Sequence, residues 1–340
     1  MTRRHRNEGS QPTLWACDGD EAVQPPERPA EHSDDQAPAE ETLHPAQTEE
    51  LWEQVFSRDN LLRALQRVEQ NRGAPGPDGM TVGRLRPFFE ANWAEVQGLL
   101  DTGRYRPQPV RRVLIPKPGG GMRELGVSSV VDRLICQAIA QVLSPIFDPG
   151  FSEASFGFRP GRSAHQAVDA ARRYVGEGAG WVVDLDLDSF FDTLDHDLVL
   201  QLVARHTDCR WILLYVERWL NAPLQREDGT LVRRDRGTPQ GSAISPLLAN
   251  VFLHYALDSW MAEEFPHIRF ERYSDDVIVH CASERQARFV RDHIAQRLAG
   301  WKLRVNRAKT RIVYCKDADR PGSHEHERFD FLGYTFRPRL

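Results

Sequence analysis

Three aspartates lie in two stretches of the chain whose residue pattern predicts β-strands. Asp186 lies near the end of the stretch 181–187. Asp275 and Asp276 belong to a turn inside the stretch 268–281. Carboxylates that are brought together repel one another unless cations are bound, and their oxygens suit Mg²⁺, which keeps waters and substrate phosphates among its ligands. Two such ions about 4 Å apart activate an attacking hydroxyl and stabilise a leaving pyrophosphate. The three residues are candidates for phosphoryl transfer, whereas an Asp-Asp pair in a turn is by itself also ordinary turn chemistry.

The pattern of strands and helices in the second half explains how these distant residues would meet. With the segment between Asp192 and Thr238 set aside, the order is strand, helix, strand, strand, helix, strand. This is the ferredoxin-like arrangement, in which the first strand and the two central strands lie side by side in one antiparallel sheet. The predicted strands are 181–187, 268–273, 277–281 and 312–314, with a short one near 303–305. The predicted helices run from Ser245-Pro246, with Ser as the cap, to about Glu263, and from a Ser283/Gln286 capping box to about Leu298.

The first half contains helices separated by loops that are rich in Pro and Gly. Apolar spacing predicts helices within 61–68, 88–100 and 131–142, a strand at 110–115, and a helix at 167–175 opened by a Ser163/Gln166 capping box. The loops 74–79 and 116–121 interrupt them. We therefore predict an α+β fold in which the ordered part follows a separate tail at 1–47.

The net charge of −5 is unevenly distributed along the chain. Residues 1–50 carry four Arg and twelve Asp or Glu, a balance of −8, whereas residues 51–340 carry 40 basic and 37 acidic residues, a balance of +3. The acidic, Pro-rich tail is predicted to be disordered. The folded part is mildly basic, which permits phosphate binding without demonstrating it.

The sequence predicts a cytoplasmic protein without a membrane partner. No apolar run approaches the ~18 residues of a membrane span, and the first residues lack the apolar stretch of a signal peptide. The five cysteines are far apart and form no CxxC pair. That spacing fits a reducing compartment and argues against a zinc ribbon.

The residues around the aspartates match the motifs of a known family. Residues 273–276, Tyr-Ser-Asp-Asp, resemble the Y-x-D-D box of reverse transcriptases, and residues 186–192 resemble its D-x-x-x-F-F-D motif. Residues 237–250 are similar to the G-T-P-Q-G-x-x-x-S-P-L-L-A-N block of group II intron-encoded reverse transcriptase/maturases. Further matches lie at 72–79, 115–121, 155–163 and 331–334, so that the resemblance covers about residues 51–336 in family order.

The resemblance implies a right-hand polymerase with a fingers region at 48–180 and a ferredoxin-like palm at 181–340, and a reverse transcriptase domain of about 96–336. It implies an RNA-directed DNA polymerase, a nucleotidyltransferase of a mobile element that adds dNTPs to a primer 3′-hydroxyl. The implied partners are an RNA template, namely group II intron RNA, a DNA primer or target, and two Mg²⁺ ions for which Mn²⁺ is a substitute. Such activity would be associated with the bacterial nucleoid.

The resemblance also implies a role for each matching residue. Asp186, Asp275 and Asp276 would be catalytic and would bind the metals together with the backbone carbonyl of Leu187. The nucleotide-binding residues would be Lys117 and Arg123 at the triphosphate, Phe191 under the sugar, Gln240 at the nucleotide or at the template base opposite it, and Lys309 as a proton donor to pyrophosphate. The primer grip would be Phe331, Leu332, Gly333 and Tyr334.

Several of these residues also have an ordinary structural interpretation. Phe191 is a sugar gate or a core residue, and Lys117 is a ligand or a loop lysine. Arg159 and Arg162 contact template phosphate or water. Asp184 and Asp188, which alternate onto the face of Asp186, are supporting groups or a solvated strand end.

Two departures from the family pattern bear on function. Gly126-Val127-Ser128 replaces the usual G-I-P, and the chain stops at Leu340, where relatives continue into a thumb or maturase region. The resemblance therefore leaves three alternatives to an active intron reverse transcriptase. These are a truncated or inactive remnant, an RNA-binding splicing cofactor (maturase), and a domesticated reverse transcriptase in phage defence or diversification.

Overall fold

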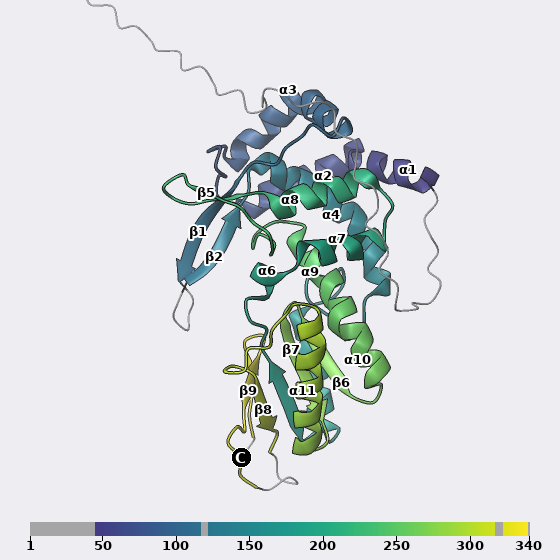
Figure 1. Cartoon of the computed structure of the whole chain (residues 1–340), viewed down its shortest axis with the longest axis vertical. Helices are drawn as coiled ribbons and strands as arrows, with labels where there is room; N and C mark the ends of the chain where they lie inside the picture. The colour runs from purple at the N-terminus through teal and green to yellow at the C-terminus, as the bar shows by residue number, and fades with distance from the viewer. Residues whose placement is uncertain (1–44, 117–121, 317–321, 339–340) are drawn as a thin grey trace, which may run out of the picture.

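The computed structural model describes residues 45–116, 122–316 and 322–338, and shows an upper, mainly helical part above a lower sheet (Figure 1). A hairpin of two long strands projects from one side of the upper part (Figure 1). The elements of the first half are α1 (Pro45–Val55), α2 (Arg58–Asn71), α3 (Val82–Asp101), β1 (Val110–Pro116), β2 (Met122–Val127), α4 (Val130–Phe147), the short 3₁₀ helix η1 (Asp148–Gly150) and α5 (Ala164–Gly176).

Helix α4 is the centre of the upper part. Ser129 caps it by accepting a hydrogen bond from the backbone N–H of Asp132, and most of its apolar side chains are buried. Asn60 of α2 donates to the carbonyls of Val55 and Ala138 at 2.8 and 2.9 Å, which joins α4 to the helices that precede it. Within the described residues, the segment Val130–Gly150 is the one helix long and apolar enough to cross a membrane, a weak signal because a buried core helix also satisfies this criterion.

The second half of the chain begins with the first strand of the lower sheet and then continues into the upper part. Its elements are β3 (Trp181–Leu185), α6 (Phe190–Thr193), α7 (His196–Ala204), α8 (Arg210–Asn221), β4 (Leu224–Gln225), β5 (Leu231–Val232), α9 (Ser245–Leu253), the π-helical turn η2 (His254–Asp258) and α10 (Ser259–Glu264). Strands β4 and β5 extend the β1–β2 hairpin to a sheet of order β2-β1-β4-β5.

The lower sheet confirms the predicted ferredoxin-like arrangement. Its remaining strands are β6 (Arg269–Tyr273), β7 (Asp276–Cys281) and β8 (Arg311–Tyr314), with α11 (Glu284–Gly300) between β7 and β8. The order is β6-β7-β3-β8 and every neighbouring pair is antiparallel, so that the first strand lies beside the third and fourth, as the βαββαβ pattern requires. The fold is thus α+β. The segment between β3 and β6, which contains α6 to α10, leaves the lower sheet after β3, contributes to the upper part and returns to the sheet at β6.

Both faces of the lower sheet are covered. Val183 and Val279 face the large core with α9 and α11, whereas Val182, Ile278 and Val313 face a smaller core with α5. A hairpin of β9 (Phe329–Phe331) and β10 (Tyr334–Phe336) also packs on the second face. Because strand residues alternate between faces, Asp184 and Asp186 belong to this second face.

Three local predictions were wrong in detail. The stretch 303–305 is not a strand and contributes only a bridge between Val305 and Leu187. Ser245 is the first helical residue of α9 and not its cap, because its hydroxyl donates instead to the carbonyl of Pro239 at 2.9 Å. At α11, Gln286 accepts from the N–H of Ala282 rather than from Ser283, so the box is half formed, whereas the Ser163/Gln166 box is complete.

The division into a tail, fingers at 48–180 and a palm from 181 stays a prediction. Helix α5 precedes the predicted boundary but packs on β6 and β7 of the lower sheet. The tail lies outside the described residues, apart from the start of α1.

Candidate active site

Two of the three aspartates lie where β6 turns into β7: Asp275 is in the two-residue turn after Tyr273, and Asp276 is the first residue of β7. Tyr273 pairs with Asp276, and Ser274 has a φ of 60°. A positive φ at the first central residue is typical of a type II′ hairpin turn. In the β3–β7 ladder Leu185 pairs with Val277, so the next pair along the two strands sets Asp186 opposite Asp276. The structure therefore brings together the ends of two strands that are about 90 residues apart in the sequence.

The carboxylates at these strand ends disfavour one another's charge. The pKa of Asp276 is raised to about 6, first by partial removal from water and then by the charges of Asp275 and Asp186, while Arg123 opposes the shift. The pKa of Asp184 is also raised to about 6, by burial and by the charges of Asp276 and Asp186. Repelling carboxylates at one sheet edge are the electrostatic condition that a bound cation relieves.

A loop after α11 fixes the end of β3. The backbone N–H of Asn306 donates to the carbonyl of Asp186 at 2.8 Å, and the N–H of Asp186 donates to the hydroxyl of Thr310 at 3.2 Å. The ammonium of Lys309 lies 3.5 Å from both carboxylate oxygens of Asp186. Lys309 thus supplies one positive charge beside Asp186, and its role as a proton donor stays a prediction.

The same loop orients the backbone of Leu187. The carbonyl of Asp186 and the N–H of Asp188 both point toward the segment that contains Val305, where they bond to the backbone of Asn306 and Arg304. Successive carbonyls in a strand point to opposite edges, so the carbonyl of Leu187 points toward the side of β7 and its turn. Asp188 itself lies at the exposed end and approaches Arg304 at 3.5 Å.

The donor set fits a hard divalent cation, although the side chains do not yet converge. Among the residues that the structure describes, no three His, Cys, Asp or Glu side chains are placed to hold one metal ion. The carboxylate of Asp186 faces Lys309 instead. Carboxylate and carbonyl oxygens are nonetheless the ligands that Mg²⁺ prefers, and burial together with the charges of Asp275 and Asp186 raises the pKa of Asp276.

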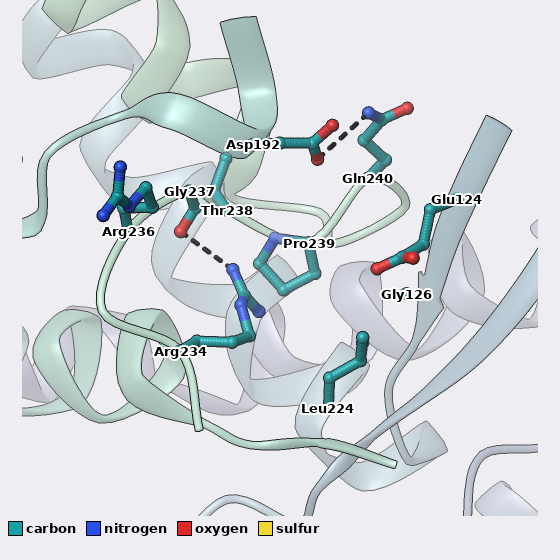
Figure 2. A pocket seen from close by; sticks show the side chains of 10 residues that line it. All are labelled: Glu124, Gly126, Asp192, Leu224, Arg234, Arg236, Gly237, Thr238, Pro239 and Gln240. Atoms are coloured by element: carbon teal, nitrogen blue, oxygen red, sulfur yellow. Dashed lines mark hydrogen bonds between the residues drawn. The ribbon is translucent and has the colours of Figure 1, made fainter. Parts of the chain in front are cut away.

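The G-T-P-Q-G loop joins this site to the upper part of the molecule (Figure 2). Thr238 donates its N–H to the carbonyl of Phe191 at 2.7 Å, and the carbonyl of Gln240 accepts from the N–H of Gly126 in β2 at 3.0 Å. A Cβ on Gly237 would lie 2.8 Å from the backbone of Asp192, so glycine is required for this close approach. The side chain of Gln240 extends toward Asp192, with 3.4 Å between amide nitrogen and carboxylate oxygen (Figure 2).

A cavity of about 330 Å³ lies under this loop, between β2 and β4. Figure 2 shows that Arg234 enters it from below and donates to the carbonyl of Gly237 at 2.8 Å. His196 contacts the same carbonyl at 2.8 Å. Two side chains therefore fix the backbone at the start of the loop, and sequence motifs gave no sign of either.

The two phenylalanines of the F-F-D motif have different environments. Phe190 is buried, whereas Phe191 is half-buried and meets Phe190 edge-on with ring centroids 5.3 Å apart. The position of Phe191 fits a residue with one face available, and the gate role stays a prediction.

The remaining nucleotide-binding and primer residues are placed differently. Lys117 lies outside the described residues. Phe331 is buried in the small core beside β3, Leu332 and Gly333 form a turn with φ values of 51° and 82°, and Tyr334 is 45% exposed. Positive φ at both central residues is the pattern of a type I′ hairpin turn, which presents Tyr334 to solvent while Phe331 anchors the hairpin.

The most deeply buried cation of the described chain was not anticipated from the sequence. Arg272 stands one residue before Tyr273, and both it and its ion-pair partner Asp258 are fully buried. Its guanidinium donates to Asp258 at 2.6 and 2.8 Å, to the Oδ1 of Asn250 at 2.9 Å, to the hydroxyl of Ser155 at 2.8 Å and to the carbonyl of Ser274 at 3.0 Å. The sequence carries no signal for this role, because β6 also carries Arg269 and Glu271 and nothing local distinguishes Arg272 from them.

Neither interpretation offered for Arg159 is correct. Its guanidinium is buried and bonds to the carboxylate of Asp148 and to the carbonyls of Ser152 and Ser155, so it closes the turn after α4. Arg162 remains at the surface in an ion pair with Glu153.

Comparison with known proteins assigns the fold and the motifs to one family. A family model described as reverse transcriptase (RNA-dependent DNA polymerase) matches residues 115–336, about two thirds of the chain. The chain belongs to the reverse transcriptase family. The G-T-P-Q-G loop, the Y-x-D-D turn and the lower sheet, described above from their geometry, all lie within the matched range.

Relatives of this reverse transcriptase include proteins encoded by introns. Protein YkfC of Escherichia coli (strain K12) is 30% identical over 315 residues, which cover 81% of this chain and 79% of YkfC. The group II intron-encoded protein LtrA of Lactococcus lactis subsp. cremoris is 34% identical over 229 residues, covering 67% of this chain and 37% of LtrA. A putative COX1/OXI3 intron 1 protein of Saccharomyces cerevisiae is 33% identical over 205 residues, covering 60% and 24%. The reverse transcriptase thus spans most of YkfC but well under half of the two intron proteins.

Two solved structures match this chain with TM-scores below 0.5. A chain of a partial Cas6-RT-Cas1–Cas2 complex has a TM-score of 0.42 and 26% identity, and covers 72% of this chain and 40% of its own. Telomerase from Candida tropicalis has a TM-score of 0.48 and 15% identity, with 72% of this chain and 47% of the telomerase chain covered.

Proposed function

We propose that this reverse transcriptase extends a primer 3′-hydroxyl on an RNA template by phosphoryl transfer with two Mg²⁺ ions, in the mobility of a group II intron. The observation that carries the proposal is the set of mutually repelling carboxylates at the ends of β3 and β7, with Lys309 beside them. In-line phosphoryl transfer needs positioned cations and an aligned nucleophile more than it needs protein acid-base groups.

Each group at the sheet edge has a part in this scheme. Asp186 and Asp275 would hold the ions with the carbonyl of Leu187, and Asp276 would complete the set. When bound, Mg²⁺ supplies activation of the hydroxyl and neutralises charge on the phosphates. Lys309, which lies 3.5 Å from Asp186, would donate a proton to departing pyrophosphate.

The incoming dNTP would lie between the fingers hairpin and the sheet. Arg123 on β2 already acts electrostatically on Asp276, and it would pair with the triphosphate together with Lys117. Phe191 would exclude a 2′-hydroxyl, and Gln240 would contact the nucleotide or its template partner.

Primer extension tests the proposal directly. Purified protein is incubated with poly(rA)/oligo(dT), dTTP and Mg²⁺, with Asp275→Ala as the inactive control and Mn²⁺ as a replacement for Mg²⁺. We expect elongation by the wild-type protein alone. Folded wild-type protein that does not elongate in either metal would contradict the enzymatic proposal and leave a remnant or a splicing cofactor.

The sugar gate has a test of its own. In Phe191→Ala the preference for dNTP over rNTP should fall by about 10- to 100-fold, because the ring no longer excludes the added hydroxyl. Phe190→Leu is the matched control, since Phe190 is buried. Equal discrimination in Phe191→Ala and wild type would assign Phe191 to the core.

A further inference from the structure

Phe158 combines two features that are unfavourable for the stability of the fold. Its side chain is 58% exposed, and its backbone φ is +57°, a conformation that residues with a side chain rarely adopt. A glycine or a polar residue would suit such a position better. Strained backbone and exposed apolar surface at one residue indicate function more often than stability.

The backbone beside Phe158 is held tightly against the catalytic turn. A Cβ on Gly157 would lie only 2.4 Å from the backbone nitrogen of Ser274, so the two segments are in direct contact. Asn250 donates to the carbonyl of Gly157 at 2.7 Å and accepts from buried Arg272, which in turn donates to the carbonyl of Ser274. The position of Phe158 relative to the turn is therefore fixed by a buried network.

That network places the ring of Phe158 beside Tyr273. The two ring centroids are 6.1 Å apart, so the two side chains form one aromatic surface next to the carboxylate turn. A second pair, His165 and Tyr334, lies further along the same segment with ring centroids also 6.1 Å apart.

We propose that Phe158 and Tyr273 form a platform against which the last two nucleotides of the primer strand pack. This inference rests on the proposed function, because a primer 3′-hydroxyl must reach the carboxylates that follow Tyr273. Aromatic side chains bind nucleotides without regard to sequence, through their bases and sugars. The platform is apolar, whereas the neighbouring carboxylates are negatively charged. It would therefore bind the primer end through van der Waals and stacking contacts and not through charge.

Direct binding to nucleic acid separates this inference from the polymerase proposal. Fluorescence anisotropy without added metal would measure the affinity of the full chain for a labelled oligo(dT)/poly(rA) primer–template and for single-stranded poly(rA). Phe158→Ala should weaken primer–template binding about tenfold, leave binding to poly(rA) unchanged, and leave the melting temperature within error. Phe289→Ala is the matched control, because Phe289 is 54% exposed on α11 and should change neither affinity.

Kinetics supply the second measurement. In primer extension Phe158→Ala should raise the KM for primer–template about tenfold and leave kcat at saturation nearly unchanged, and Phe158→Trp should restore most of the affinity. Wild-type affinity in Phe158→Ala would overturn the platform, and an equal loss for poly(rA) alone would overturn the assignment to the primer strand. A wild-type protein that binds primer–template but does not extend it would instead contradict the polymerase proposal.

Discussion

The catalytic turn separates two groups of charged side chains that are built in opposite ways. In the buried cluster, which comprises Arg272, Asp258, Asn250 and Ser155, all five N–H donors of the guanidinium have an acceptor within 3.0 Å. In the carboxylate cluster, which comprises Asp186, Asp275 and Asp276, burial and then the like charges of its neighbours raise the pKa of Asp276. The buried cluster is complete without a ligand, whereas the carboxylate cluster has an excess of negative charge. A charged residue whose hydrogen bonds are all made within the protein therefore has a structural role, whereas a cluster with uncompensated charge is suited to bind a ligand.

The largest effect should come from the carboxylate cluster. Asp275→Ala removes an oxygen ligand of the proposed cations, whose stabilisation of the transition state amounts to several kcal/mol, so the rate of primer extension should fall by at least about 10³-fold. The free energy of unfolding should hardly change, because no contact that holds the fold is lost. Parallel extension assays and urea unfolding measure both. A variant that keeps more than a tenth of the wild-type rate would remove Asp275 from the catalytic set.

The buried cluster should respond in the opposite way, through stability. Arg272→Met leaves Asp258 buried without a partner, and breaking such a pair costs about 3 to 5 kcal/mol. The control is Arg162→Met, which breaks the exposed pair with Glu153 and should cost at most about 1 kcal/mol. Urea denaturation of both variants provides the comparison. Similar losses in the two would show that Arg272 does not depend on burial for its effect.

The sequence predicted the carboxylate cluster much better than the buried cluster. Alternation of apolar residues and the strand order were enough to bring Asp186 to the strand end that carries Asp276, because a ferredoxin-like sheet has a fixed strand order. Arg272 could not be assigned, since its partners Asp258 and Ser155 stand 14 and 117 residues away. A π-helical turn, which presents Asp258, has no recognisable pattern in a single sequence.

The same limit explains the local errors. Ser245 followed by Pro246 has the sequence of a helix start, but the tertiary bond to Pro239 takes the hydroxyl that capping would use. Arg159 is one of several arginines in a loop, and only the carbonyls of the folded turn after α4 show that it is structural. The local sequence predicts where helices and strands lie. It does not predict the hydrogen-bond partners of a polar side chain, because those depend on the completed fold.

A smaller effect should appear when cations are added to folded protein. Ligands that bind only the folded state stabilise it, and a concentration of about ten times Kd contributes about 1.4 kcal/mol. Mg²⁺ should therefore raise the melting temperature of wild-type protein but not that of Asp275→Ala, while Arg162→Met should respond like wild type. Thermal melts with and without millimolar Mg²⁺ make the measurement. An equal rise in Asp275→Ala would place the bound ions elsewhere.

The smallest effect is a gain in stability from removing one of the repelling charges. The pKa of Asp276 is about 6 in the folded protein against 3.8 for an ordinary aspartate. The ionised carboxylate therefore lowers the free energy of unfolding. This penalty is fully present above about pH 6, declines as the pH falls from 6 toward 3.8, and is absent below that range. At pH 7 without metal, Asp276→Asn should be more stable than wild type by on the order of 1 kcal/mol, a figure reduced because solvent at Asp276 screens the repulsion.

The pH dependence of that gain makes the comparison decisive. The advantage of Asp276→Asn should shrink steadily between pH 6 and pH 4, since the wild-type carboxyl takes up a proton there and loses its charge. Added Mg²⁺ should reverse the order at pH 7, because the cation binds the carboxylate that the variant lacks. Asp330→Asn is the control, as Asp330 is an exposed carboxyl on β9. A gain for Asp276→Asn that did not depend on pH would mean that packing or hydrogen bonding, and not charge, separates it from wild type, and the carboxylate cluster would then resemble the buried one.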